Sequence, residues 1–254
     1  MSKRNTQQRR HLIATLVQEQ GEVSVEQLSE QFETSEVTIR KDLTILEESG
    51  LLLRRYGGAI KMPSEFIDEQ HIENVSKQKK SIAKLAVSCI REHNRIIIDS
   101  GSTTGALIPY LNQSGLVVMT NSLTLASELT ALEIEPTVLM TGGTWDSRSE
   151  SFQGKVAETA LRSYDFDQLF IGADGLDLAR GTTTFNELVG LSQVMAEVSR
   201  EVNVMIESHK MARKMPNVEL DWDHIDRVIT DNQIDLEMKK ALEQKGIDVL
   251  IAQI

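Results

Sequence analysis

The chain has 254 residues, of which 40% are hydrophobic, and a formal net charge of -11 at pH 7. Its single cysteine, Cys89, cannot form an internal disulfide, and the first residues lack the apolar core of a signal peptide. No run approaches the ~20 consecutive apolar residues that a membrane-spanning helix needs. These features argue against a disulfide-rich secreted domain and an integral membrane protein, and they predict a protein of the reducing cytoplasm.

The acidic charge is unevenly distributed along the chain. Residues 1–62 carry nine of the 27 basic and nine of the 38 acidic residues, so the whole negative excess lies after them. Within this neutral segment, basic residues cluster at 3–10, 40–41 and 54–61, apart from an acidic stretch at 19–36. Such clustering can give a neutral domain one basic face, so the acidity of the whole chain does not exclude DNA binding.

Two short helices are expected in the first part of this segment. Apolar residues recur at helical spacing between residues 12 and 17, and Gly21 is a suitable stop for that helix. Ser24 stands three residues before Gln27, a capping-box arrangement that satisfies two free amides at the start of a second helix.

A third helix is expected after Ser35. Ile39, Leu43 and Leu46 fall at i, i+4 and i+7, so the opposite face should point to solvent. Arg and Lys on that face can bond guanine edges or phosphates, and an exposed Val can contact a thymine methyl. The candidate DNA-binding residues here are Ser35, Val37, Thr38, Arg40, Lys41 and Thr44. Periodicity alone leaves a simple solvated face of a helical bundle equally open.

The segment LLLRRYGGAIK, residues 51–61, is expected to form two short strands around a Gly57-Gly58 turn. Cationic and hydroxyl side chains beside the turn of such a hairpin can reach the DNA backbone next to the groove. The candidates are Arg54, Arg55 and Tyr56. Three helices followed by a basic hairpin predict a winged helix-turn-helix DNA-binding domain, which we place at residues 3–58.

The rest of the chain predicts a connector and a larger α/β domain. Residues 59–78 contain Pro63, several charges and no sustained apolar period, as expected for an exposed linker. Residues 79–254 follow. Their short apolar runs are RIIID, LVVMT, PTVLM, QLFIGAD, NVMIE, DRVIT and DVLIA. Because helical patterns lie between most of these runs, we expect a mainly parallel sheet with helices on both faces.

Ligands of such sheets bind beyond the carboxyl ends of the strands. After RIIID, small residues precede a predicted helix through Leu107 and Leu111, and their backbone amides suit a phosphate, although an ordinary capped turn is the alternative. Polar turns after other runs should lie at the same edge, forming a pocket for a polyhydroxylated anion. The turn residues that we select are Ser100, Gly101, Ser102, Thr103, Thr104, Asn121, Gly142, Gly143, Asp174, Asn186, Glu187 and Lys210.

Residues 35–59, SEVTIRKDLTILEESGLLLRRYGGA, resemble the fingerprint of the DeoR family of bacterial transcriptional regulators in a dense, ungapped match. In that family the helix carrying TIRKDL enters the major groove. The resemblance therefore implies that Thr38, Arg40 and Lys41 contact DNA, and that Asp42 stabilises the motif. Further along the chain, VMTNSL, GGTWDSRSESFQG, GADGLDLARGTTTFNE and ITDNQIDLEMKKALEQKGIDVLI resemble more closely the regulators of glucitol (sorbitol) operons.

The same resemblance implies a ribose-5-phosphate isomerase-like fold for the second domain, with residues 101–104 holding a phosphate. It places polar and acid-base groups at Asp99, Asp174, Glu187 and Lys210. One departure stands out, because residues 207–210 read Glu-Ser-His-Lys where many family members have Asp-Ser-Ser-Lys. The lysine is kept, while the surrounding pocket chemistry differs.

Together these observations predict a repressor of a sugar-utilisation operon, by closer resemblance a glucitol operon. It should bind double-stranded operator DNA as a homo-oligomer, a dimer or a tetramer, and be released by a phosphorylated sugar or polyol such as glucitol 6-phosphate. The alternatives are a sugar-phosphate isomerase-like enzyme and a regulator of another carbohydrate operon. No catalytic residue, cofactor or membrane partner is expected. No metal is expected either, because the five histidines show no ligand spacing.

Overall fold

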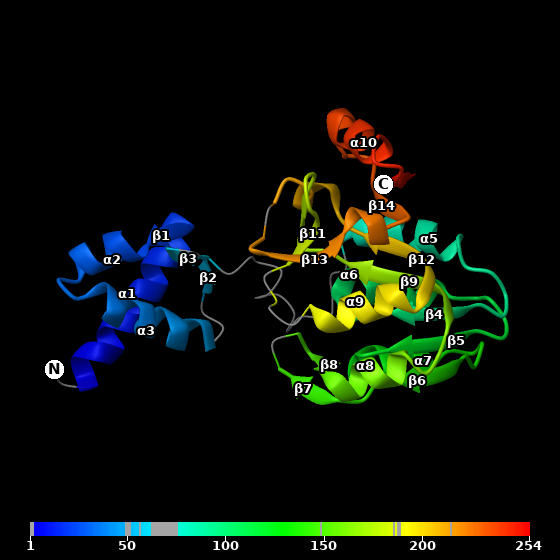
Figure 1. Cartoon of the computed structure of the whole chain (residues 1–254), viewed down its shortest axis with the longest axis horizontal. Coiled ribbons are helices and arrows are strands. Elements are labelled where there is room, and N and C mark those ends of the chain that lie inside the picture. The colour runs from blue at the N-terminus through cyan, green and yellow to red at the C-terminus, as the bar shows by residue number, and fades with distance from the viewer. Residues whose placement is uncertain are drawn as a thin grey trace. The chain divides into compact units, whose positions relative to one another are not determined.

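The computed structural model divides into two compact units, Met1–Asn74 and Val75–Ile254, each with its own hydrophobic interior (Figure 1). It describes residues 3–48, 52–55, 57–61, 76–147, 149–184, 186, 189–213 and 215–254. Most of the expected connector, residues 59–78, therefore lies outside the described residues. The predicted bounds of the connector were too wide, because a strand of the first unit runs to Ile60 and a helix of the second begins at Lys77.

The first unit consists of three helices and a small antiparallel sheet. Its elements are α1 (Lys3–Gln20), β1 (Glu22–Ser24), α2 (Val25–Gln31), α3 (Glu36–Glu48), β2 (Leu53–Arg55) and β3 (Gly58–Ile60). Strands β2 and β3 pair as the predicted hairpin, although Gly58, expected in the turn, is the first residue of β3 and pairs with Arg55. Strand β1, which we did not predict, pairs with the other edge of β3. The winged helix-turn-helix fold is thereby confirmed.

Local signals set the ends of these helices. Gly21 has a φ of +79° and donates its N–H to the carbonyl of Val17 at 3.0 Å, which ends α1. The capping box is also present: the N–H of Gln27 donates to Ser24 Oγ at 3.0 Å, and the N–H of Ser24 donates to Gln27 Oε1 at 2.9 Å. These short-range bonds explain why the sequence could locate both helix ends.

The second unit is built on a seven-stranded sheet. Its strands are β4 (Arg95–Ile98), β5 (Val117–Thr120), β6 (Thr137–Met140), β9 (Phe166–Gly172), β12 (Ser199–Met205), β14 (Arg227–Asp231) and β15 (Asp248–Ala252). All seven coincide with the apolar runs of the sequence, and every neighbouring pair is parallel. The order is β15-β14-β12-β9-β4-β5-β6. Chain order therefore reverses between β4 and β9, which makes the carboxyl ends of these two strands the topological switch point.

Helices cover both faces of this sheet (Figure 1). Apolar side chains of the sheet and the helices pack together on each face. The helices are α5 (Lys77–Val87), α7 (Leu123–Thr130) and the 3₁₀-helix η2 (Ile108–Tyr110) on one face, and α8 (Lys155–Leu161), α9 (Gly190–Glu197) and α10 (Leu236–Glu243) on the other. Ile96 and Ile98 of β4 pack into the first layer and Ile97 packs into the second. The predicted α/β fold with both sheet faces buried is confirmed.

Two local predictions were wrong. The single helix expected through Leu107 and Leu111 is divided into α6 (Ser102–Gly105) and η2, because Pro109 has no N–H with which to continue an α-helix. The polar turn from which Asn186 and Glu187 were selected was expected to include Thr183 and Thr184, but these two residues belong to strand β11. Strand propensity and pairing override the turn-like composition there.

Smaller elements complete the second unit. They are the antiparallel sheet β10 (Gly175–Asp177), β11 (Gly181–Thr184) and β13 (Asn217–Asp221), the hairpin β7 (Thr144–Asp146) and β8 (Ser151–Gln153), and the 3₁₀-helices η3 (Ser208–Lys210) and η4 (Trp222–His224). Within the described residues, no helix combines the length and apolar character needed to cross a membrane.

Candidate DNA-binding surface and effector site

Helix α3 presents a polar, partly basic face opposite its buried side. Ile39 and Leu43 are fully buried in the interior of the first unit, whereas Val37 is 60% exposed. Arg40 and Lys41 are exposed beside it. This is the orientation that the helical period predicted, so the groups suited to a major groove are available at the surface.

The polar residues of this surface interact with one another. Arg40 forms an ion pair with Glu36, with a separation of 2.6 Å between Nη2 and Oε2. The hydroxyls of Ser35 and Thr38 lie 2.9 Å apart. Exposed ion pairs of this kind contribute little to stability and exchange readily. The Arg40 guanidinium can therefore leave Glu36 for a phosphate or a base edge.

The hairpin of β2 and β3 is fastened to α3. Arg54 donates from Nη1 to the hydroxyl of Thr44 at 2.8 Å, and its backbone N–H donates to Glu47 Oε1 at 3.1 Å. Arg55 pairs with Glu22 of β1. Both arginines are exposed, so the wing presents two guanidinium groups whose positions are set relative to the helix. Tyr56 lies outside the described residues.

Beneath this surface, Asp42 is part of a buried ionic cluster. Its Oδ2 accepts from Nε of Arg9 and its Oδ1 accepts from Nε of Arg10, both at 2.7 Å. Asp42 is 1% exposed and Arg9 is 7% exposed. Arg9 is one of the basic residues at 3–10, which could have formed part of a basic face, but its side chain is turned inward. The cluster joins α1 to α3, in agreement with the stabilising role that the resemblance implied for Asp42.

The predicted effector residues lie in loops at the carboxyl edge of the main sheet. Asp99 to Thr104 follow β4, Asn121 follows β5, Gly142 and Gly143 follow β6, Asp174 follows β9, and Lys210 lies beyond β12. The loops after β4 and β9 flank the switch point, whereas the loop after β6 is two strands away from β4. Asn186 follows β11 of the smaller sheet, and Glu187 lies outside the described residues.

Asn121 links the loops after β4 and β5. Its Nδ2 donates to Asp99 Oδ1 at 2.8 Å, and its Oδ1 accepts the N–H of Ser100 at 2.9 Å. The hydroxyl of Thr104 lies 2.8 Å from the carbonyl oxygen of Asp99, which closes the loop on itself. Gly101 has a φ of +139°, a conformation that other residues rarely adopt. The loop is therefore held in shape from within.

Three carboxyl groups meet beside this loop. Asp174 accepts from the Thr184 hydroxyl at 2.8 Å, and Glu219 of β13 accepts from the Ser192 hydroxyl at 2.8 Å. Burial raises the pKa of Asp99 to about 6. Burial, together with the negative charges of Asp99 and Asp174, raises the pKa of Glu219 to about 8. Glu219 is therefore protonated at neutral pH and can donate a hydrogen bond.

Glu219 was not predicted as a site residue, because it stands in an acidic run, VELDWD, that looks like an ordinary solvated segment. Only the pairing of β13 with β11 brings it to the site. Two residues outside the predicted set also lie at the site. Lys79 of α5 donates from Nζ to Ser102 Oγ at 2.8 Å, and Glu207 is buried with its Oε2 3.9 Å from Lys210 Nζ.

We expect the Glu219→Gln variant to lose part of the pH dependence of stability. The pKa of Glu219 is higher in the folded chain than in the unfolded chain, so the folded state binds more protons between about pH 4.5 and 8. Stability should therefore fall as pH rises through that window, and the neutral amide removes this loss. The measurement is the melting temperature of the variant minus that of wild type. This difference should be larger at pH 9 than at pH 6 by about 2 °C or more.

Glu237→Gln is the matched control for this measurement, because the Glu237 side chain is 83% exposed. Its difference from the wild type should not change with pH. A flat difference curve for Glu219→Gln would show that the carboxyl ionises normally.

Comparison with known proteins assigns both units. A model of the DeoR-like helix-turn-helix domain matches residues 9–65, and a model of the DeoR C terminal sensor domain matches residues 74–232. The chain belongs to the DeoR family. As in other members, a DNA-binding unit is followed by a sensor unit, and the sites described above lie one in each.

This DeoR-family chain matches proteins named as transcriptional regulators over nearly the whole length of both chains. It is 37% identical to the putative aga operon transcriptional repressor of Escherichia coli O157:H7, covering 97% of this chain and 94% of that one. It is 32% identical to the regulator GlpR of Haloferax volcanii, covering 96% of each. Ribose 5-phosphate isomerase A of Methanocaldococcus jannaschii matches 53% of each chain with a TM-score of 0.38 and 17% identity.

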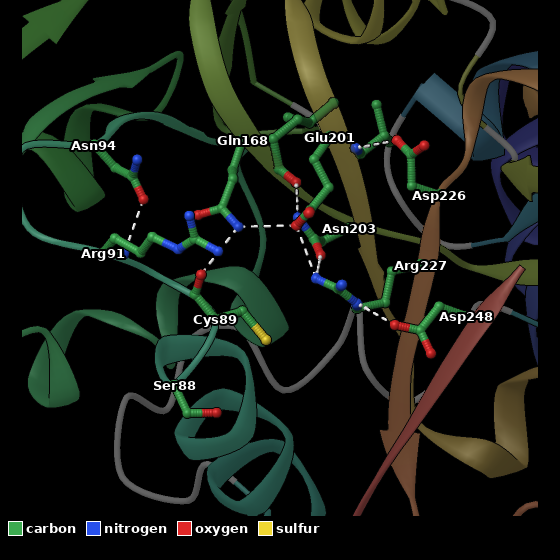
Figure 2. Close-up of polar contacts among 12 residues, drawn as sticks. Ser88, Cys89, Arg91, Asn94, Gln168, Glu201, Asn203, Asp226, Arg227 and Asp248 are labelled. Atoms are coloured by element: carbon green, nitrogen blue, oxygen red, sulfur yellow. Dashed lines mark hydrogen bonds and ion pairs between the residues drawn. The ribbon is translucent and has the colours of Figure 1, made fainter.

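The opposite, amino edge of the sensor sheet carries a separate polar cluster (Figure 2). Arg227 donates to Glu201 Oε1 and to Asp248 Oδ2, both at 2.8 Å, and to Asn203 Oδ1 at 3.1 Å. Gln168 donates to Glu201 at 2.8 Å. These bonds tie the starts of β9, β12, β14 and β15 together around a cavity of about 390 Å³. The cluster lies at the end of the strands away from the predicted effector loops.

Across the described part of the chain, no three His, Cys, Asp or Glu side chains are arranged to hold a metal ion.

Proposed function

We propose that the protein represses a sugar-utilisation operon and is released from its operator by a phosphorylated sugar or polyol. The observation that carries this proposal is the presence, in one DeoR-family chain, of an exposed basic helix face and a polar site at the switch point of the sensor sheet. The first is suited to DNA and the second to a small anionic ligand. We further propose that it acts in the cytoplasm as a dimer or a tetramer, because operator half-sites usually mirror the symmetry of the protein.

The DNA-binding part of the proposal rests on α3 and the wing. Val37, Arg40 and Lys41 lie on the exposed face of α3, and Arg54 and Arg55 lie on the adjacent hairpin. A recognition helix reads base edges while a neighbouring wing contacts phosphates. We assign Ser35, Thr38, Thr44 and Tyr56 to the same surface.

The sensor part rests on the chemistry at the carboxyl edge. Gly101 to Thr104 offer backbone amides, Ser102 and Thr103 offer hydroxyls, and Lys79 brings an ammonium group to Ser102. These groups suit a phosphate. Asp99, Asp174 and the protonated Glu219 suit sugar hydroxyls, and keeping Glu219 neutral reduces repulsion of an anion. Asn121, Gly142, Gly143, Asn186, Glu187 and Lys210 complete the proposed set.

Glucitol 6-phosphate is our first candidate effector, supported by the resemblance of four stretches between residues 118 and 251 to regulators of glucitol operons. The relatives of this chain are named for different operons and transport systems, among them the aga operon and a lactose phosphotransferase system. The class of effector and the individual effector are therefore tested together but judged separately.

The expected result is that glucitol 6-phosphate lowers the affinity for operator DNA by about 5- to 150-fold, the usual range of coupling between two sites. The measurement is fluorescence anisotropy with a duplex that the wild-type protein selects from a random library. Glucitol, glucose 6-phosphate and inorganic phosphate serve as controls. Release by glucose 6-phosphate alone would reject glucitol 6-phosphate and keep the class, and release by no phosphorylated compound would reject the class.

The three carboxyl groups favour one alternative function, because acids with raised pKa values can shuttle protons in an aldose-ketose isomerisation. The relatives are named as transcriptional regulators, which supports binding without turnover. Incubating the protein with aldose phosphates and assaying ketose phosphates separates the two. Formation of a ketose that Glu219→Gln abolishes would establish the enzyme.

A further inference from the structure

The first turn of α5 is basic and adjoins the connector. Ser76 caps this helix by accepting the N–H of Lys79 at 3.1 Å. Lys77, Lys79 and Lys80 follow, and the turn has no acidic residue. The positive end of the helix dipole makes this an unfavourable place for three ammonium groups unless an anion lies nearby. Because residues 62–75 join α5 to the DNA-binding unit, this turn is where the sensor unit meets the connector in the chain.

Two hydrogen bonds join this turn to the predicted effector loops. The Ser76 hydroxyl donates to Glu207 Oε1 at 2.7 Å, and Lys79 Nζ donates to Ser102 Oγ at 2.8 Å. Glu207 is 3% exposed, and its other oxygen lies 3.9 Å from Lys210 Nζ. One turn of α5 is thus bonded to the loop after β4 and to the loop after β12.

We propose that the first turn of α5 detects the effector through Lys79 and transmits its presence to the connector through Ser76 and Glu207. This rests on the proposed function. A phosphate bound beside Ser102 attracts the ammonium groups of Lys79 and Lys210. As Lys210 turns toward the phosphate, its ion pair with Glu207 is broken. Glu207 then holds Ser76 differently, and the capped end of α5 shifts.

An allosteric effect requires a ligand that binds two states with different affinity, and this arrangement can give the effector such a difference. Ser76 is suited to the relay because its single hydroxyl donates to Glu207 and accepts from the Lys79 backbone. The length of Glu207 matters too. An aspartate at this position is one methylene shorter and would draw the carboxylate away from Ser76.

The experiment uses the full chain and five variants, of which four are described first. Ser76→Gly removes the hydroxyl at little cost in helix capping, and Ser76→Thr restores it. Lys79→Met removes the proposed phosphate contact, and Lys80→Met removes an exposed lysine of the same turn as a matched control. Calorimetry measures binding of glucitol 6-phosphate and of inorganic phosphate. Anisotropy with the selected duplex measures DNA affinity with and without each compound.

Lys79→Met should weaken binding of glucitol 6-phosphate about tenfold or more, because it removes a hydrogen bond between two charged groups, whereas Lys80→Met should not. Ser76→Gly should bind DNA and effector within about threefold of wild type, yet lose most of the 5- to 150-fold release that coupling normally provides. Ser76→Thr should keep the release. Glu207→Asp should reproduce the Ser76→Gly result, which covers the case in which Ser76→Gly folds poorly.

The outcomes separate this inference from the proposed function. If the effector releases the wild-type chain from DNA and releases both Ser76→Gly and Glu207→Asp equally well, the relay is overturned. Unchanged effector affinity in Lys79→Met overturns the phosphate contact. A wild-type chain that binds no phosphorylated compound overturns the proposed function, and the inference with it.

Discussion

Replacing Asp42 with alanine is expected to destabilise the first unit by about 3–5 kcal/mol, the usual cost of removing one partner from a buried ion pair. The variant leaves Arg9, which is 7% exposed, with a guanidinium that has lost its carboxylate. Because small domains are stable by about 5–15 kcal/mol, this is a large share of the total. The DNA-binding unit should unfold under conditions in which the sensor unit remains folded.

The positions of the tryptophans allow the two units to be followed separately. Both tryptophans of the chain, Trp145 and Trp222, belong to the sensor unit. In urea, the far-UV circular dichroism of Asp42→Ala should show an early loss of helix, while the tryptophan fluorescence transition should match that of wild type. Coincident, unchanged transitions would contradict the role of the ionic cluster.

Two controls refine this prediction. Arg10 is 29% exposed and shares Asp42 with Arg9, so Arg10→Ala leaves the buried pair intact and should cost only about 1 kcal/mol. The double variant Arg9→Met, Asp42→Leu removes both buried charges and should recover most of the lost stability. Recovery distinguishes an unpaired charge from a simple loss of packing.

The second large effect is expected on DNA binding. Arg40→Ala and Lys41→Ala should each weaken operator binding by about 1–3 kcal/mol, or roughly 5- to 150-fold, if each side chain contacts a base edge. Both residues are exposed on α3, so neither substitution should affect folding. Anisotropy with the selected duplex at several salt concentrations provides the measurement. Loss of a phosphate contact should reduce the slope of log affinity against log salt by about 1.

Lys240→Ala is the matched control for charge, because Lys240 is an exposed lysine of the sensor unit. It lowers the net charge of the chain by the same amount without touching α3 and should bind DNA as wild type does. If Arg40→Ala and Lys41→Ala also bind as wild type does, α3 is not the reading helix.

Much of the fold could be predicted because its signals are local. The Ser24 and Gln27 capping box, the period of Ile39 and Leu43, and the apolar runs of the sheet all depend on neighbours along the chain. The loops of the site could be predicted for a related reason, since residues that follow parallel strands emerge at one edge. The exceptions were also local, as where Pro109 divides the helix after β4.

The amino-acid sequence by itself determined the seven strands, the winged helix-turn-helix and the outward face of α3, because side-chain period and capping are encoded within a few residues. Tertiary structure alone decided that Arg9 is buried against Asp42, that Glu219 joins Asp99 and Asp174, and that Ser76 meets Glu207. Arg9 and Asp42 are 33 residues apart along the chain, and Ser76 and Glu207 are 131 residues apart. Burial and charge interactions across such separations exist only after the chain has folded, so no local pattern records them.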